Sequence, residues 1–127
     1  MRKQYFFKPS SRGLVSWDVD RLIRLSAALP RKRVPLTQVR ELNEEWSGDS
    51  EHRTWRAMIE HVRLIDEADL SYPIILSSTG AVMDGMHRIA KAVLRGDRDI
   101  EAVQFLEDPE PDFVGRRPED LPYRPAG

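Results

Sequence analysis

The fold is decided by residues 73–96, which read PIILSSTGAVMDGMHRIAKAVLRG. The apolar run at 74–76, directly after a proline, predicts a buried strand. Turn residues at 78–80 then lead into a short return strand. The apolar positions that follow are typical of the core face of a helix, and Gly96 stands where a helix usually ends. This stretch therefore predicts strand, tight turn, short strand and helix, in that order.

Gly85 falls in the first turn of the predicted helix, where glycine costs about 1 kcal/mol relative to alanine. Close approach of another molecule to the backbone is one reason for a glycine there. Free N–H groups at a helix start, together with the positive end of the helix dipole, form an anion site. Arg88 adds a planar guanidinium that suits phosphate oxygens. We therefore predict that this turn binds phosphate.

The same residues also fit a purely structural explanation. Asp84 is an ordinary residue type for a helix N-cap, and Gly85 could simply relieve a tight turn from strand to helix. Arg88 could be a solvated surface residue. Because short glycine motifs are weak evidence, the residues alone leave both explanations open.

Composition limits the class of protein. A chain of 127 residues suits one domain, and 40% hydrophobic with 32% charged residues is ordinary for a soluble globular protein. The net charge of −1 argues against binding nucleic acid by bulk electrostatics. No apolar stretch suits a membrane span or a signal peptide, so a cytoplasmic protein is expected. The absence of cysteine excludes disulfides, a thiolate nucleophile and cysteine zinc sites.

The remaining elements follow from periodicity and helix breakers. They are an arm or short strand at 1–13, a helix from Asp18 to Leu29 ended by Pro30, a short strand at 34–36, a helix at 51–70 and a strand at 100–106. The sum is a compact single α+β domain over residues 1–127, with a small mixed sheet and two or three packed helices. Residues 14–106 form its core, and a proline-rich tail at 107–127 packs on the surface.

The helix predicted at 51–70 carries one apolar stripe, which we expect to be core rather than a binding surface. Its members are Trp55, Met58, Ile59, Val62 and Ile65. His52 and His61 are nine residues apart, about 2.5 turns, and so lie on opposite faces. We expect surface histidines that share no metal ion. The basic triplet at 31–33 predicts solvated surface, with contact to an anionic partner as the alternative.

The segment VMDGMHR at 82–88, between an apolar strand and a helix, resembles the ParB/sulfiredoxin superfamily. In that superfamily a Gly-x-x-Arg turn between strand and helix binds nucleotide phosphates. The resemblance covers residues 34–105 and is firmest over 73–96. It implies a ParB/sulfiredoxin-like fold and a bound nucleotide, which is ATP, ADP or CTP. The phosphate-binding residues that it implies are Gly85, Met86, His87 and Arg88.

Two branches of the superfamily fit poorly. Sulfiredoxins have a cysteine immediately before the His-Arg pair, where this chain has Met86. A thioether cannot attack as a thiolate does, so sulfiredoxin activity is excluded. ParB-type partition proteins bind CTP at this turn and carry a helix-turn-helix domain after it. The segment after Phe105 is too short for such a domain, so sequence-specific DNA binding by this chain alone is not expected.

Free-serine kinases, a third branch, have an Asp-Gly-His-x-Arg-like turn and a glutamate after the first strand. The turn here is similar, although the spacing of its histidine differs. The resemblance implies a catalytic glutamate in the turn at 41–45, with Glu44 preferred, then Glu41, and Glu45 left open. A solvated carboxylate is the alternative for Glu44.

Asp84 and His87 each have two interpretations in this setting. A carboxylate beside an anion makes sense if it holds Mg²⁺ or accepts a proton from a hydroxyl nucleophile, so Asp84 is a candidate catalytic and metal-binding residue. The alternative for Asp84 is N-capping. His87 either donates to a phosphate oxygen or packs as a neutral ring against the preceding strand.

Three functions follow, in order of preference. The first is a nucleotide-binding domain that transfers phosphate from ATP or ADP to a small hydroxyl compound, with Mg²⁺, by positioning and charge stabilisation. The second is a non-enzymatic or partition-related module in which nucleotide binding switches contact with a protein partner. The tail and the basic triplet would then be its interaction surfaces. The third, a nuclease or DNA-processing role, is disfavoured by the charge and by the lack of a second carboxylate-rich motif.

Overall fold

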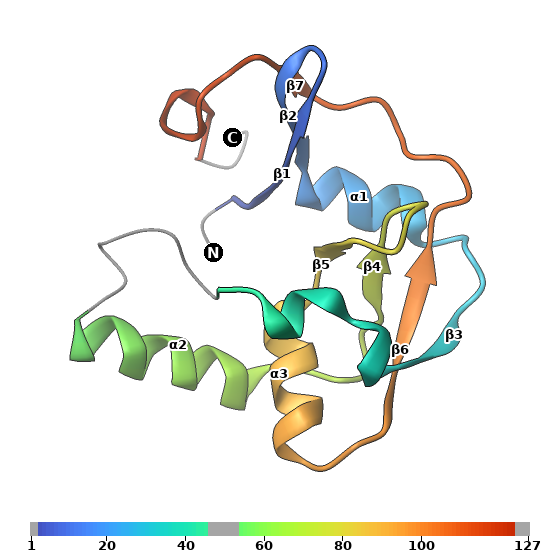
Figure 1. Cartoon of the computed structure of the whole chain (residues 1–127), viewed down its shortest axis with the longest axis vertical. Coiled ribbons are helices and arrows are strands. Elements are labelled where there is room, and N and C mark those ends of the chain that lie inside the picture. Colours follow the sequence, from blue (N-terminus) through green and yellow to red (C-terminus); the bar gives the residue numbers. More distant parts are fainter. Residues whose placement is uncertain (1–2, 46–53, 124–127) are drawn as a thin grey trace.

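Seven strands form two sheets in the computed structural model, which describes residues 3–45 and 54–123 (Figure 1). The first sheet has the order β1-β2-β7, with β1 at Tyr5–Ser10, β2 at Gly13–Asp18 and β7 at Phe113–Val114. The second has the order β3-β6-β4-β5, with β3 at Lys32–Pro35, β6 at Asp99–Gln104, β4 at Ile74–Leu76 and β5 at Val82–Asp84. The sheet is mixed, because β6 pairs antiparallel with β3 and parallel with β4.

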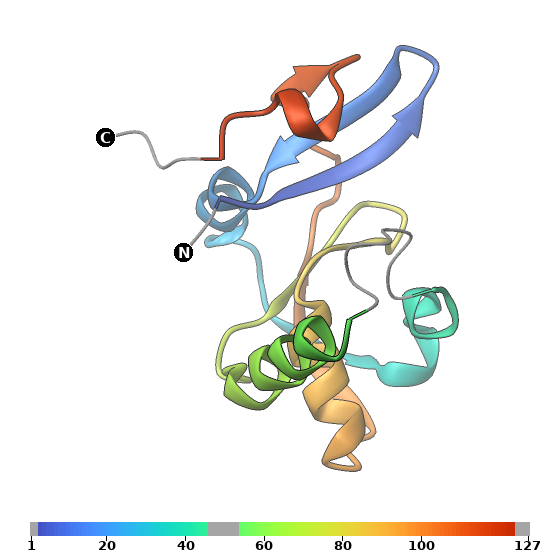
Figure 2. The same cartoon turned by 90° about the vertical axis from the view of Figure 1, so that its left-hand side faces the viewer.

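Three α-helices accompany the sheets in the described part of the chain. They are α1 at Val19–Ser26, α2 at Trp55–Glu67 and α3 at Met86–Leu94. Single 3₁₀ turns lie at Leu36–Gln38 (η1), Arg40–Asn43 (η2) and Pro118–Asp120 (η4). Helices α2 and α3 lie at one end of the molecule and the β1–β2 hairpin at the other (Figures 1 and 2). The α+β class is therefore confirmed. Within the described residues no helix is long and apolar enough to cross a membrane.

The central stretch folds as predicted. After β4, the turn closes with Ser77 N–H donating to the Ala81 carbonyl at 2.8 Å, and Gly80 N–H donating to the Ser77 carbonyl at 3.0 Å. The chain then returns as β5, enters α3 and continues into β6 beside β4. Because β4 lies between β5 and β6, both of its edges are paired, and all three of its residues are buried.

The alternation of side chains along β4 divides the core in two. Ile74 and Leu76 join a cluster on the α3 side of the sheet, while Ile75 joins a second cluster with residues of β2 and α1, including Trp17. Helix α1 begins as predicted: its N-cap is Asp18, whose carboxylate accepts from the Asp20 N–H at 2.9 Å. It ends at Ser26 rather than Leu29, three residues earlier than predicted.

The apolar stripe of α2 is not core, and that prediction is wrong. Trp55 is 80% exposed and Ile59 is 65% exposed, and Met58 and Val62 are exposed as well. The helix ends at Glu67 rather than at residue 70, and residues 51–53 of the predicted helix, including His52, lie outside the described residues. The α3-facing side of α2 instead carries half-buried residues, among them His61, whose ring contacts His87 of α3. Periodicity shows that a helix has an apolar side but not which neighbour covers it.

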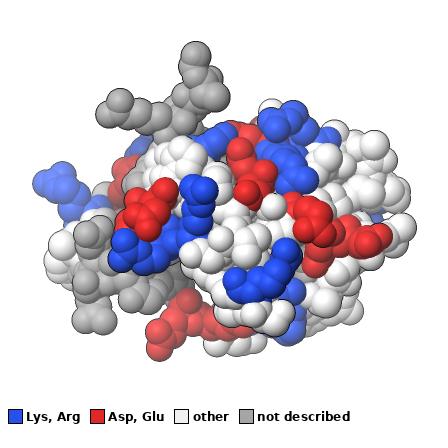
Figure 3. Space-filling view, turned by 90° about the horizontal axis from the view of Figure 1, so that it is seen from above, with Lys and Arg blue, Asp and Glu red and all other residues white. Residues whose placement is uncertain are grey.

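Residues 1–13 were predicted as an arm or a short strand, and the structure shows the strand, at Tyr5–Ser10 in the first sheet. The basic triplet is engaged within the chain. Arg31 pairs with Glu101 at 3.4 Å, Arg33 with Asp99, and Lys32 donates to Gln104. The three residues are exposed, as predicted; the charges of Arg31 and Arg33 are paired within the chain, whereas Lys32 meets a neutral amide. On the face in Figure 3 the coloured basic and acidic side chains are interspersed.

Candidate functional site

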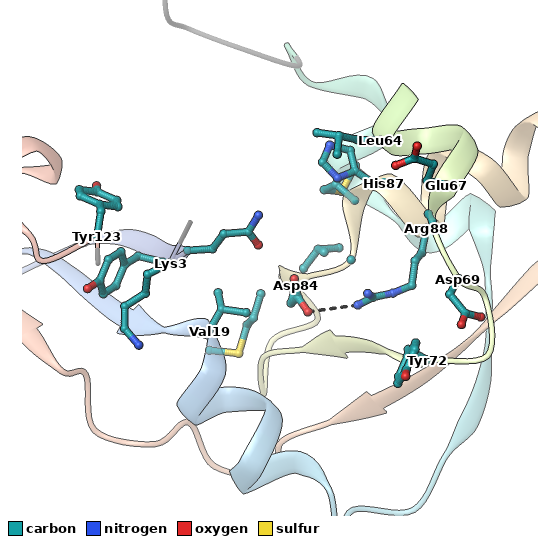
Figure 4. A pocket seen from close by; sticks show the side chains of 17 residues that line it. Lys3, Val19, Leu64, Glu67, Asp69, Tyr72, Asp84, His87, Arg88 and Tyr123 are labelled. Carbon is teal, nitrogen blue, oxygen red and sulfur yellow. Dashed lines mark hydrogen bonds and ion pairs between the residues drawn. The ribbon is translucent and has the colours of Figure 1, made fainter. Parts of the chain in front are cut away.

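A cleft of about 900 Å³ opens in front of the start of α3 (Figure 4). One wall is the junction of β5 and α3, from Val82 to Arg88. A second wall is the C-terminal end of α2 with the loop that follows it, and it includes Asp69 and Tyr72. The far wall is formed by residues 3–5 at the start of β1, Val19 of α1 and Tyr123 from the C-terminal segment. The predicted phosphate-binding turn therefore lies in the described cleft.

The backbone conformation and the packing of the protein itself require a glycine at position 85. Gly85 has φ of +119°, in the left-handed region, and it is the N-cap of α3. A Cβ at this position would lie 2.6 Å from Ile74 Cγ2 and 3.0 Å from Arg88 Nη2. Any other residue would therefore combine backbone strain with a clash against a buried strand. The structural explanation of this glycine is sufficient, and the case for a ligand must come from its neighbours.

The first amides of α3 have no side-chain cap. Because Gly85 is the N-cap, Asp84 does not cap the helix, and that interpretation of Asp84 is wrong. The first intrahelical bond runs from Ile89 N–H to the Gly85 carbonyl at 2.9 Å. The N–H groups of the preceding turn, Met86 to Arg88, have no intrahelical acceptor. They carry the positive end of the helix dipole at the cleft.

Arg88 lies in the wall of the cleft and not on open surface, so its interpretation as a solvated residue is wrong. Its Nη2 donates to Asp84 Oδ2 at 3.1 Å and to the Pro73 carbonyl at 3.4 Å. The two side chains are 19% and 17% exposed. Arg88 Nε has no hydrogen-bond partner, and Nη1 is in none of the hydrogen bonds of the described residues. Asp84 thus orients the guanidinium while part of its donor set stays unused.

His87 is half-buried beside a second histidine. Its ring centroid lies 5.0 Å from that of His61 on α2, and the two rings are tilted by 65°. Burial, followed by the charges of His61 and Arg88, lowers the pKa of His87, while Asp84 opposes this shift. A neutral imidazole with one N–H donor is the result near pH 7. His61 is half-buried and contacts His87, so the prediction of a surface histidine is wrong for it.

The predicted glutamates do not line the cleft. Glu41 Oε2 accepts from the Val82 N–H at 2.8 Å, and its Oε1 is buried without a hydrogen-bond partner. This carboxylate therefore holds the start of β5. Glu44 and Glu45 are exposed at the end of η2. Of the three predicted catalytic residues, only Asp84 belongs to the cleft.

Two carboxylates in the cleft were missed from the sequence, Glu67 and Asp69. Asp69 Oδ1 accepts from Ser71 N–H at 2.9 Å and from Ser71 Oγ at 2.7 Å. These hydrogen bonds are the main reason why the pKa of Asp69 is lowered. The Asp-x-Ser spacing before Pro73 is typical of such a turn and was available as a signal. Glu67 is engaged by Arg63 at 2.9 Å.

Lys3, from the opposite wall, is a cation in the cleft that sequence reasoning also missed. Its Nζ lies 2.9 Å from Asp18 and 3.3 Å from Asp20, so its charge is already paired. Arg88 is likewise paired, with Asp84, so the groups left for an anion are the amides at the start of α3 and the donors of Arg88 that make no hydrogen bond. No group of three or more His, Asp or Glu side chains in the described ranges could hold a metal ion.

Comparison with curated proteins gives a partial match to the transcriptional regulator NovG of Streptomyces niveus. The two are 42% identical over 57 residues, which are 43% of this chain and 18% of the regulator. The chain thus matches only a small part of that protein's length. No protein-family model matches the chain, and no solved structure matches it.

Proposed function

We propose that this chain is a nucleotide-binding domain of ParB/sulfiredoxin type, with the phosphates of its ligand at the start of α3. One observation carries the proposal: the uncapped amides of α3 and the partly engaged guanidinium of Arg88 face one cleft. Its volume, about 900 Å³, lies within the usual range for pockets that bind small ligands. The succession of β4, β5, α3 and β6 agrees with the elements that the family resemblance implies.

The chemistry of the site suits a phosphate group. The N–H groups of Met86, His87 and Arg88 are backbone donors at the positive end of a helix dipole. The guanidinium of Arg88 supplies a permanent charge that Asp84 holds in place. The neutral His87 ring adds one further donor. Binding to these groups requires no rearrangement of a charged network, because the Asp84–Arg88 pair can remain.

Binding is better supported than phosphotransfer. Glu41 is committed to the Val82 N–H, and Glu44 is exposed outside the cleft, so neither is placed as a base. The non-enzymatic alternative, in which nucleotide binding changes contact with a protein partner, requires no such base. We therefore place the module ahead of the kinase.

Phosphotransfer to a small hydroxyl compound remains the second candidate because Asp84 does line the cleft. The carboxylates that line the cleft do not come together as a metal-holding group, so Asp84 would act as a single carboxylate. It is enough for Mg²⁺ that arrives with a nucleotide, since Mg²⁺ is usually held by one or two carboxylates plus phosphate and water. Asp84 would then hold that ion or accept the proton of the hydroxyl group.

Thermal denaturation with ATP, ADP, CTP and inorganic tripolyphosphate tests the proposal. A ligand at 100 times its Kd stabilises the folded state by about 2.7 kcal/mol, so the wild-type Tm should rise. Arg88→Gln should abolish the rise. Arg95→Gln is the matched control, because Arg95 is an exposed residue at the other end of α3 that pairs with Asp97 at 3.6 Å. Equal responses of both variants would refute the proposal, and consumption of ATP with added hydroxyl compounds would separate kinase from module.

A further inference from the structure

Two histidine rings meet where α2 packs against α3. The centroids of the His61 and His87 rings lie 5.0 Å apart, and the ring planes are tilted by 65°. Both side chains are half-buried. His87 lines the cleft and belongs to the turn of α3 whose first amides have no side-chain cap. His61 lies on α2 and is not among the lining residues, so it affects the cleft through its contact with His87.

The His87 ring has hydrogen-bonding capacity that the fold does not use. Within the described ranges its ring nitrogens make no hydrogen bond and no ion pair. The charged and titratable side chains that contact the ring or line the cleft with it include His61, Lys3, Glu67, Asp69, Asp84 and Arg88. The three carboxylates each accept from a partner within the chain, and Lys3 is paired with Asp18 and Asp20. The nitrogens of His87 are therefore available to a ligand in the cleft.

His87 is neutral near pH 7 in the free protein. Burial, followed by the charges of His61 and Arg88, holds the pKa of His87 below its ordinary value of 6.5. An anion at the first amides of α3 would bring a negative charge close to the same ring. A nearby opposite charge favours the protonated form, so the pKa of His87 rises when the anion binds. The imidazolium has two N–H donors and a positive charge, whereas the neutral ring has one donor and no charge.

We propose that binding of an anion at the start of α3 is coupled to uptake of a proton by His87, and that His61 is a positioning residue for this step. The inference rests on the proposed phosphate site and adds its regulation. The proton comes from solvent and forms the second N–H bond of the ring. The contact with His61 holds the His87 ring beside the cleft, and the charge of His61 opposes the proton until the charge of the anion offsets it. His61 thus sets the pH at which the site responds.

The coupling fixes the direction of the pH dependence. Well above the pKa of His87 in the complex, the ring is neutral with and without the anion, so affinity does not change with pH. As the pH falls through that value, affinity rises by at most about tenfold per pH unit, which is the limit for one proton. The rise ends below the lower pKa of the free protein. Backbone amides and a guanidinium do not titrate in this range, so without His87 their affinity would be constant.

Sulfate is a suitable probe, because it remains a dianion between pH 8 and 5.5, whereas phosphate groups titrate near pH 6. Its affinity is measured across this range at constant ionic strength, from the amide NMR shifts of Met86, His87 and Arg88. The pKa of His87 is followed from its ring proton signals with and without sulfate. We expect several-fold tighter binding at pH 5.5 than at pH 8, and a higher pKa of His87 when sulfate is present.

The outcomes separate the coupling from the anion site itself. Sulfate that binds equally at both pH values, with an unchanged titration of His87, would overturn the coupling and leave the proposed site intact. Absence of sulfate binding at every pH would overturn both. His87→Gln should bind sulfate with a flat profile, at about the affinity of the wild type at pH 8. A pH dependence that survives this substitution would place the proton elsewhere and contradict the proposal.

Two substitutions of His61 separate its charge from its packing. His61→Phe keeps a ring against His87, His61→Gln removes the ring, and both remove the charge. In both variants the rise in affinity should move to higher pH, and His61→Phe should keep the wild-type affinity at pH 8. Ile59→Phe is the control that should reproduce the wild-type profile, because Ile59 is 65% exposed on the same helix. Weaker binding at every pH, with the position of the rise unchanged, would show that His61 only supports the fold and would overturn its assigned role.

Discussion

Arg88 and Asp84 face each other across the first turn of α3, with Nη2 of the arginine 3.1 Å from Oδ2 of the aspartate. The aspartate is therefore neither an N-cap nor free to act without its partner. It holds the guanidinium near the N-terminus of α3, and it also places a negative charge where a phosphate is expected. These two effects of Asp84 oppose each other and can be separated by mutation.

Asp84→Asn removes the negative charge and keeps the shape of the side chain. We expect a loss of stability on the order of 2 kcal/mol from the lost charged hydrogen bond. Affinity for tripolyphosphate without metal should rise several-fold because repulsion is removed. Calorimetric titration of wild type and variant, each with Mg²⁺ and with EDTA, checks this. If Asp84 instead holds Mg²⁺, the variant should bind ATP more weakly with Mg²⁺ and equally well with EDTA.

Gly85→Ala should destabilise the protein by about 2–5 kcal/mol, since it combines left-handed backbone strain with overpacking. The added Cβ would meet Ile74, a fully buried residue that cannot move aside without disturbing β4. Gly96→Ala is the matched control at the other end of the helix. Gly96 also has positive φ, but its added Cβ would meet nothing within 4 Å, so about 1–2 kcal/mol is expected. Urea unfolding measures both, and equal losses would contradict the packing account.

Substitution of Glu41 should lower the stability of the fold, whereas substitution of Glu44 should not. Glu41→Ala leaves the Val82 N–H without its acceptor and should cost about 1–3 kcal/mol of stability. Glu41→Gln keeps an acceptor oxygen and should lose much less. Glu44→Ala should change neither stability nor nucleotide binding, because that side chain is exposed outside the cleft. A Glu44→Ala variant that binds nucleotide normally but no longer consumes ATP would restore the kinase interpretation.

His87 makes stability depend on pH in a defined direction. Its pKa is lowered in the folded state from an ordinary value of 6.5, so the unfolded chain binds its proton more readily. The stability that this group contributes is fully present above about pH 6.5 and is lost as pH falls through the folded-state pKa. His87→Gln should flatten this part of the profile between pH 7.5 and 5.5. Parallel profiles for variant and wild type would show that other groups are responsible.

The core of the fold could be predicted because its signals are local. An apolar run after Pro73, a turn ending at Gly80 and a helix ended at Gly96 each specify backbone geometry through neighbouring residues. The same holds for Asp18, whose carboxylate caps α1 as predicted. The limits of the helices were less well predicted, since helix ends depend on tertiary contacts.

The errors concern contacts between distant segments. The spacing of the apolar residues from Trp55 to Ile65 correctly predicted a helix, but the position of α3 determined which side was covered. Likewise, no sequence pattern showed that Glu41 would meet the Val82 N–H or that the rings of His61 and His87 would touch. The glycine at 85 was identified as unusual, yet its cause is the side chain of Ile74 across the hairpin.

The most direct test of the account is a backbone amide NMR titration of the protein with inorganic tripolyphosphate, which has no nucleobase. We predict saturable shifts that are largest at the amides of Met86, His87 and Arg88 and at the Nε–H of Arg88. Arg88→Gln should remove them while leaving the amide signals of the exposed α2 residues Trp55 and Ile59 unchanged. Absence of saturable shifts at these amides, or larger shifts elsewhere in the chain, would contradict the assignment of this helix start as a phosphate site.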